Sequence, residues 1–259
     1  MPSLDYLPDV LNPFPRKFEI LQSLDYPPDV STNITYNISI GYDCFTCNYK
    51  VVVVSCYQFL GFIEKNYKIC CKTQVRAHTL GTNFWKRIPD FPSEITGLPE
   101  ECPGKFVSGT INWAIEDQEK YYLWVILSLD LGNESYQVIP HPEYGLDEPL
   151  VYLNLSVSKD CLCVVAHTNS FLDIWLMKVY GNKDSWTKLF TIPFEKLIGC
   201  PLPASLLYIA EEGDLVFLDL FDNVYIYNYK NGNVKIPDIQ GLPSNSFNSI
   251  VYFESLISP

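Results

Sequence analysis

The chain has 259 residues, of which 47% are hydrophobic and only 19% are charged, and this balance excludes an intrinsically disordered protein. Its 18 basic and 30 acidic residues leave a formal net charge of −12, which argues against nucleic acids and anionic membranes as partners. Aromatic residues make up 15% of the chain, a composition that favours β-sheet.

The first 20 residues contain four prolines and two aspartates, which is unlike a secretory signal peptide. The longest nearly uncharged apolar stretch, 121–129, is about half as long as a membrane span. Nine scattered cysteines, an odd number, indicate free thiols rather than a disulfide framework. We therefore expect a soluble protein of the cytoplasm or nucleus, in which the sequons at Asn33, Asn37, Asn133 and Asn154 are strand and turn residues.

Strand candidates follow one another in four groups along the chain. The first two groups are TYNISIGYD, YKVVVVSC, TQVRAHTL and FWKRI, then GKFVSG, TINWAI, WVILSLDL and SYQVI. The last two groups are LNLSVS, CLCVVAH, FLDIWLMKVY and SWTKLFTI, then SLLYIAEE, GDLVFLD, NVYIYNYK and VKIPDI. Turn residues able to adopt positive φ stand at the junctions: Gly109, Gly132, Gly181, Gly213 and Gly232. No segment has a sustained 3.6-residue apolar period, so few helices are expected.

One hairpin recurs along the chain, as AHTLGTNFWKRI, SLDLGNESYQVI, VYGNKDSWTKLFTI and YNYKNGNVKIPDI. When the copies are aligned on Trp85, Tyr136, Trp186 and Val234, successive offsets are 51, 50 and 48 residues. A period near 50 is about the length of a kelch-type propeller blade. The sequence therefore predicts an all-β, propeller-like fold with four recognisable four-stranded blades.

A propeller must close, and the closing blade is expected to combine strands from both ends of the chain. The candidates are RKFEIL near the N-terminus and NSIVYFESLISP at the C-terminus, and at least two further strands have no candidate. We therefore expect residues 1–35 to be a remnant of an incomplete closing blade, and residues 36–259 to form the propeller-like domain. Truncation at the N-terminus would expose sheet edges and make the isolated chain prone to aggregation.

Six spaced motifs resemble the kelch-like associated domain of plant F-box proteins, from about Asn12 to Pro259. They are IGYDCFTCNYKVVVV, LGTNFWKRIPDFP, GKFVSGTINWAI, ILSLDLGNESYQVI, FLDIWLMKVYGNKDSWTKLFTI, and IYNYKNG followed by VYFESLISP. Leu11 stands where the family usually has Trp, and no segment resembles the helical F-box that should precede the domain.

The resemblance implies a role in protein recognition and no catalytic residues or cofactor. In such proteins the F-box binds a Skp-type adaptor of a cullin ubiquitin ligase, and the associated domain captures the target for ubiquitination. Here a Skp-type adaptor is expected only if an F-box lies upstream, and the acidic charge favours a basic target. The alternatives are a truncated paralogue that binds targets without ligase coupling and, from a different class, a propeller enzyme acting on carbohydrate.

Three groups of residues have types suited to chemistry, and each also has a structural interpretation. Cys44 and Cys47 have the spacing of a zinc knuckle or redox pair, but no second pair completes a zinc site, and the related sequences usually carry Asp, Pro or Ser here. The three histidines, without a nucleophile motif, are expected to be structural. These are His78, His141 and His167.

Acidic residues that a glycosidase would need cluster at two predicted turns, where solvent exposure or backbone hydrogen bonding also explains them. They are Glu211, Glu212, Asp214, Asp219 and Asp222. Four tryptophans are expected to fill the interfaces between blades. They are Trp85, Trp113, Trp175 and Trp186.

Overall fold

The computed structural model describes residues 34–63, 66–95, 97, 99, 103–117, 123–145, 148–197, 204–210, 215–220 and 223–237. Within these ranges the fold is almost entirely β-structure, with two short 3₁₀ helices, Lys183–Ser185 and Phe194–Lys196. No helix in the described ranges is both long and apolar enough to cross a membrane. The expected all-β class is confirmed.

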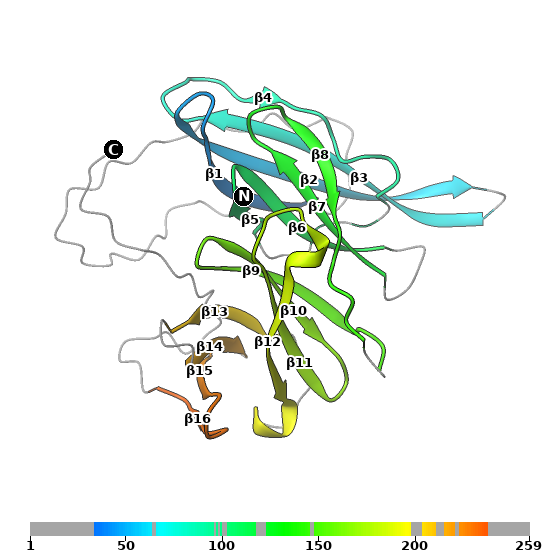
Figure 1. The fold of residues 1–259 in the computed structure, drawn as a ribbon. Coiled ribbons are helices and arrows are strands. Elements are labelled where there is room, and N and C mark those ends of the chain that lie inside the picture. Colours follow the sequence, from blue (N-terminus) through cyan, green and yellow to red (C-terminus); the bar gives the residue numbers. More distant parts are fainter. Residues whose placement is uncertain are drawn as a thin grey trace.

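The described strands form four separate four-stranded sheets, which we call the first to fourth blades (Figure 1). The first blade contains β1 (Ile34–Asp43), β2 (Asn48–Ile63), β3 (Asn66–Thr79) and β4 (Lys86–Arg87). The second contains β5 (Lys105–Val107), β6 (Thr110–Glu116), β7 (Trp124–Asp130) and β8 (Ser135–Ile139). The third contains β9 (Tyr152–Ser158), β10 (Cys161–His167), β11 (Phe171–Met177) and β12 (Trp186–Pro193), and the fourth β13 (Ser205–Ile209), β14 (Leu215–Leu220), β15 (Asn223–Asn228) and β16 (Val234–Lys235).

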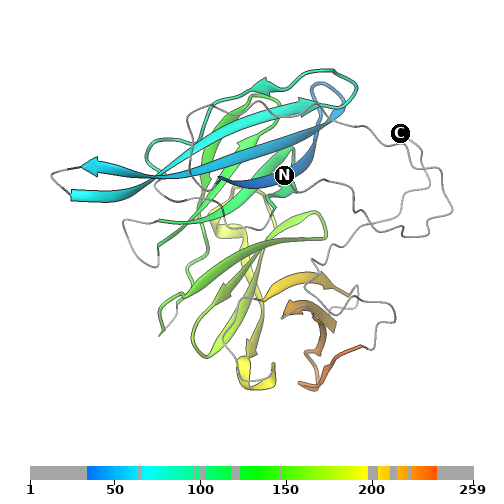
Figure 2. The same cartoon turned by 180° about the vertical axis from the view of Figure 1, so that it is seen from behind.

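Each blade is an antiparallel meander in which consecutive strands pair. The first strands of neighbouring blades contact one another: β1 contacts β5, β5 contacts β9, and β9 contacts β13. The blades therefore follow one another in chain order around a curve, with their first strands innermost (Figures 1 and 2). This is the arrangement of a propeller, and it confirms the four-blade prediction; the strand candidates for a closing blade lie outside the described residues.

The aligned repeat residues occupy equivalent places in the blades. Tyr136, Trp186 and Val234 lie in the fourth strands of their blades, and Trp85 immediately precedes β4. The outer strands β4 and β16 have only two residues each, shorter than the sequence pattern predicts. The hairpin of β2 and β3 is longer than predicted and projects beyond the other strands (Figure 1).

In the part of the chain that the structure describes, three apolar cores hold the blades together, and each core lies between two consecutive blades. Val52 and Val75 of the first blade pack in one cluster with Ile111 and Leu129 of the second. The second and third blades share a cluster that includes Ile126, Leu153, Leu155, Leu162 and Val164, and the third and fourth share one that includes Val165, Ile174, Ile192, Val216 and Leu218. Because the side chains of a strand alternate between faces, each middle blade contributes to two cores.

Buried polar side chains on the inner strands join neighbouring blades as well. In β9, Asn154 donates a hydrogen bond to Ser205 over 2.6 Å, and Ser156 donates to the carbonyl oxygen of Leu206 over 2.6 Å. In β1 the same Asn-x-Ser pattern places Asn37 against the second blade. Asn37 and Asn154 are buried, so these two sequons are strand residues, as expected.

The turn predictions are confirmed at Gly109, Gly181 and Gly232, which have φ of 78°, 78° and 69°. The prediction for Gly132 was wrong, because Glu134 is the residue of that turn with positive φ, at 54°. Gly132 meets a different requirement, which is close contact with an aromatic ring from the first blade. Gly213 lies outside the described residues.

Candidate functional site

Exposed aromatic side chains gather at one end of the first blade. In a meander the β1–β2 turn and the β3–β4 loop emerge at the same end of the sheet, and they carry Phe45 and Phe84. These side chains are 78% and 63% exposed, and Tyr49, at the start of β2, is also exposed. We call Phe45, Tyr49 and Phe84 the aromatic end of the first blade. Large aromatic side chains on an exposed, rigid support are typical of protein interfaces.

The β1–β2 turn is held by the last residue of β1. Asp43 is buried and accepts hydrogen bonds from the backbone N–H of Phe45 and from the hydroxyl of Thr46, both at 2.8 Å. Cys47 closes the turn with a left-handed φ of 52°. Asn48 then donates to the carbonyl oxygen of Leu80 over 2.7 Å, which ties this turn to the β3–β4 loop.

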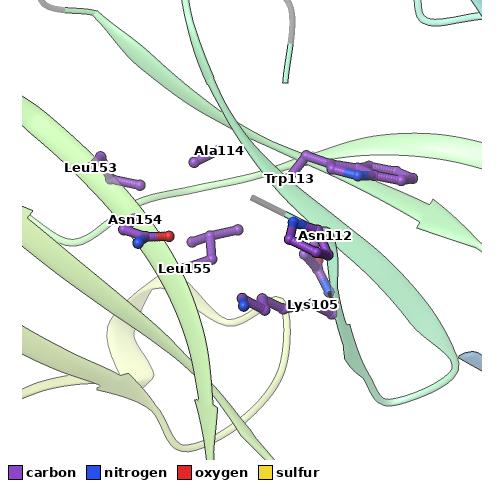
Figure 3. Close-up of a pocket in the computed structure, with 8 residues that line it drawn as sticks. Lys105, Asn112, Trp113, Ala114, Leu153, Asn154 and Leu155 are labelled. Atoms are coloured by element: carbon purple, nitrogen blue, oxygen red, sulfur yellow. Dashed lines mark hydrogen bonds between the residues drawn. The ribbon is translucent and has the colours of Figure 1, made fainter. Parts of the chain in front are cut away.

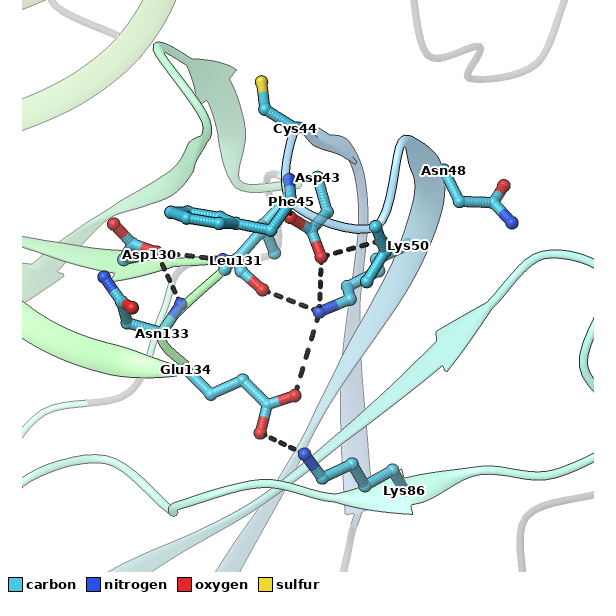
Figure 4. A network of polar contacts seen from close by, with 12 residues as sticks. Asp43, Cys44, Phe45, Asn48, Lys50, Lys86, Asp130, Leu131, Asn133 and Glu134 are labelled. Carbon is cyan, nitrogen blue, oxygen red and sulfur yellow. Dashed lines mark hydrogen bonds and ion pairs between the residues drawn. The ribbon is translucent and has the colours of Figure 1, made fainter.

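A buried lysine connects the turn to the second blade (Figure 4). The Nζ of Lys50 lies 2.9 Å from the carboxylate of Asp43 and donates to the carbonyl oxygen of Leu131 over 2.7 Å. It also lies 3.8 Å from Glu134, whose other carboxylate oxygen is 2.6 Å from Lys86. Since the Lys50 side chain is 8% exposed, its charge depends on these partners rather than on water.

This network sets the ionisation of Asp43. Burial opposes its negative charge, but hydrogen bonds from Lys50, Thr46 and the backbone of Phe45 outweigh burial and hold its pKa below the ordinary value. Asp43 and Lys50 therefore form a charged pair that fixes the turn.

Phe45 rests on the β7–β8 turn of the second blade. A Cβ atom added to Gly132 would overlap the ring of Phe45, so only glycine permits this contact. Asp130 stabilises the same turn by accepting hydrogen bonds from the backbone N–H groups of Gly132 and Asn133, both at 2.8 Å. One side of the Phe45 ring therefore packs on Gly132, while most of the side chain remains exposed.

Two hollows occur near the second and third blades. The first, between β6 and β9, has a volume of about 10 Å³, enough for about one water molecule and too small for an organic ligand (Figure 3). The second is an open groove of about 480 Å³ with a largely apolar lining. Its lining includes Leu123, Trp124, Val138, Pro140 and Tyr144, and an ion pair of 2.7 Å between Glu143 and Lys183 lies at its rim.

The two cysteines of the predicted zinc or redox pair lie in the β1–β2 turn, where both are exposed and free. The Sγ of Cys47 lies 3.4 Å from the carbonyl oxygen of Cys44. Desolvation, followed by the electrostatic interaction with Cys47, raises the pKa of the neighbouring Tyr42. Among the described residues, no group of three or more His, Cys, Asp or Glu side chains is placed to hold a metal ion.

The three histidines lie in different parts of the fold. His78 is buried in β3 against the ring of Trp85, and His141 stacks on Tyr144 in the segment after β8. His167 is buried at the end of β10, where its Nε2 lies 3.1 Å from the carbonyl oxygen of Ala204. Burial lowers the pKa of His167 to about 4. The three rings are not brought together in the structure.

Three of the four predicted interface tryptophans contribute to the cores between blades. Trp113 is buried between the first and second blades, while Trp175 and Trp186 pack at the edge of the core between the second and third. Trp85 is half-buried beside β4. The sequence prediction missed Trp124, which is buried in the core between the second and third blades.

Of the acidic residues considered for glycoside hydrolysis, all except Asp219 lie outside the described residues. Asp219 lies in β14, where it pairs with Ser205 of β13 and Val224 of β15. The third described sequon, Asn133, lies in the β7–β8 turn, as expected. Asn33 is outside the described residues.

Comparison with known proteins finds similar proteins in the plant Arabidopsis thaliana. The F-box/kelch-repeat protein At3g23880 of Arabidopsis thaliana is 25% identical over 87% of this chain and 56% of its own length. The F-box protein CPR1 of Arabidopsis thaliana is 27% identical over 73% of this chain and 48% of its own length. The chain thus spans about half the length of these curated relatives.

Among solved structures, the β-propeller domain of the trilobed protease from Pyrococcus furiosus aligns with a TM-score of 0.38 and 12% identity, over 78% of this chain and 57% of that chain. A family profile described as the F-box associated beta propeller domain matches residues 9–259. This range includes the whole stretch over which the six motifs show their resemblance. The chain therefore belongs to the family of F-box associated beta propeller domains.

Proposed function

We propose that this chain is the part of an F-box protein that recognises a target protein for ubiquitination. The observation that carries the proposal is the exposed aromatic end of the first blade. It gives a chain of the F-box associated family a surface suited to binding a protein. Phe45 and Phe84 offer apolar area on connections whose backbone is fixed by hydrogen bonds, so binding costs little ordering. Loops on a rigid scaffold are also where binding residues are usually found.

The partner that fits this chain is a basic protein. The net charge of −12 favours encounter with a positively charged surface, and exposed aromatic rings accept lysine and arginine side chains through cation–π contacts. In this proposal the target binds across Phe45 and Phe84, and an F-box connects the domain to a Skp-type adaptor and a cullin ligase.

Site-specific crosslinking tests target binding. A photoreactive amino acid replaces Phe84 in the full-length protein in plant cells, and the crosslinked target is identified and purified. Because truncation of a central aromatic residue commonly costs 2 kcal/mol or more, Phe45→Ser and Phe84→Ser should each weaken target binding about 30-fold. The matched control is Val138→Ser, which removes an exposed apolar side chain from the groove beside the second blade.

Each outcome of this test has a defined meaning. Loss of affinity in both phenylalanine variants and none in the control supports the aromatic end as the binding surface. Loss only in Val138→Ser would assign recognition to the groove instead. Ligase coupling is tested separately by immunoprecipitating the native protein: a Skp-type adaptor in the complex supports the ligase role, and a target without an adaptor would indicate recognition without ligase coupling.

A further inference from the structure

Cys44 and Cys47 occupy opposed backbone positions at the tip of the β1–β2 hairpin. The last pair of the ladder is Asp43 with Asn48, so the two cysteines occupy the next opposed positions in the same register. They are the first and last residues of the four-residue turn. Such a turn brings its end Cα atoms within about 7 Å, and a disulfide spans about 4.4–6.8 Å between Cα atoms.

The position of the Cys47 sulfur atom agrees with this backbone geometry. The Sγ of Cys47 is directed back across the turn, 3.4 Å from the carbonyl oxygen of Cys44. Both thiols are exposed and free, so a small oxidant can reach either one. By contrast, Cys56 and Cys163 are buried, and burial raises the pKa of Cys163 to about 12, so its reactive thiolate is scarce at neutral pH.

We propose that Cys44 and Cys47 are a redox-active dithiol that closes to a disulfide by exchange with a small-molecule disulfide such as oxidised glutathione. One cysteine thiolate attacks a sulfur of oxidised glutathione, and a mixed disulfide forms as one glutathione thiolate leaves. The second cysteine thiolate then attacks the cysteine sulfur of that mixed disulfide and displaces the other glutathione thiolate. The two protons lost by the cysteines end on the two glutathione molecules, so the cysteines are oxidised and one glutathione disulfide is reduced.

The three other cysteines whose side chains the structure describes do not share this arrangement. Cys161 and Cys163 are two residues apart on one strand, so they lie side by side along β10 rather than opposite one another. Cys56 lies within β2, opposite Thr35 and Thr73. Among the cysteines whose side chains the structure describes, only Cys44 and Cys47 combine exposure with opposed positions across a hairpin turn.

Thiol trapping on the full native chain tests the proposal. The protein is equilibrated in buffers of increasing oxidised glutathione, quenched with acid and alkylated. One portion is then mapped by peptide mass without reduction, and a second portion is reduced and alkylated with a second reagent to locate each protected cysteine. We expect Cys44 and Cys47 to become protected together, within one peptide that carries an internal disulfide and no glutathione. Cys56 and Cys163 should react only after unfolding.

Single variants provide the matched controls. In Cys47→Ser the reaction must stop at the mixed disulfide, so Cys44 should retain one glutathione, and Cys44→Ser should leave one glutathione on Cys47. Both substitutions are at exposed turn positions, so circular dichroism should match the native chain. A wild-type chain that holds glutathione on both cysteines, stays reduced at both, or pairs either cysteine with any other cysteine would overturn the proposal.

Discussion

The indole Nε1 of Trp113 donates a hydrogen bond of 2.9 Å to the side-chain oxygen of Asn37, and this bond crosses from the second blade to the first. Both side chains are buried. Ser39, two residues further along β1, donates to the same Asn37 oxygen and accepts from the backbone N–H of Gly104. The apolar interface between the first two blades therefore contains a polar contact that specifies how β1 and β6 meet.

Replacing Trp113 by Phe should weaken this interface. The substitution removes the indole donor and leaves the Asn37 oxygen with one partner fewer, so the free energy of unfolding should fall by about 1–2 kcal/mol. Urea unfolding of Trp113→Phe, Asn37→Ala and the double variant measures the coupling, which we expect to be about 1 kcal/mol. Strictly additive effects would show that the two side chains do not stabilise one another.

The two lysines that contact Glu134 should differ strongly in their contribution to stability. Lys50→Met leaves the buried carboxylate of Asp43 without its cation and should lower the free energy of unfolding by about 3 kcal/mol. Lys86 is 59% exposed, so Lys86→Met should cost less than about 1 kcal/mol. Urea titrations of both variants make the comparison, and equal losses would contradict the role assigned to Lys50.

Acidification should destabilise the chain through His167. Its pKa of about 4 in the folded chain lies below the ordinary 6.5, so the unfolded chain takes up a proton first as the pH falls. The contribution of neutral His167 to the free energy of unfolding is fully present above pH 6.5 and is lost as the pH falls towards 4. At pH 5 the loss is about 2 kcal/mol. His167→Gln keeps a donor for Ala204 without this titration. The difference in free energy of unfolding between His167→Gln and the wild type, measured by urea titration, should therefore change by about 2 kcal/mol between pH 7 and pH 5. A difference that stays constant over this pH range would contradict the assignment to His167.

Gly132→Ala should move the ring of Phe45 without unfolding the protein. The new methyl group would overlap the ring, and the exposed ring can rotate away, so the cost should stay below about 1 kcal/mol. A fluorinated phenylalanine placed at position 45 reports the movement by ¹⁹F NMR. Gly109→Ala is the control: it strains a backbone with φ of 78° but has no atom within 4 Å, so the signal should not shift. An unchanged signal in Gly132→Ala would contradict the contact.

Local sequence patterns predicted a candidate for each described strand, and they predicted the four-blade repeat. Alternation of apolar residues and the hairpin signals depend on neighbours in sequence, and they identified the strands of all four blades. The extension of β2 and β3 was missed, because residues beyond Cys56 no longer show a clean alternation. The outer strand β4 is shorter than predicted because only Arg87 and Lys86 pair with β3.

The candidate site was less accessible to sequence reasoning. In the sequence, Lys50 is a charged residue at the start of a run of valines. No neighbouring residue indicates that it donates a hydrogen bond to the carbonyl oxygen of Leu131, 81 residues later. Gly132 looked like a turn glycine, whereas its real constraint is a ring from another blade. The cysteine pair was visible as a motif, but its opposition across the hairpin required the register of β1 and β2.

Each of the three cores is built from two consecutive blades, so no described blade has a core of its own. If one blade were removed, the two apolar faces that had packed against it would meet, although they were not shaped for one another. If one blade were duplicated, the new copy would need a matching apolar face on each of its two neighbours. The residues that must be kept together in such an array are therefore those on the two sides of one core, rather than all the residues of one blade. Substitutions that change one side of a core should be accepted during evolution mainly together with substitutions on the side that faces it.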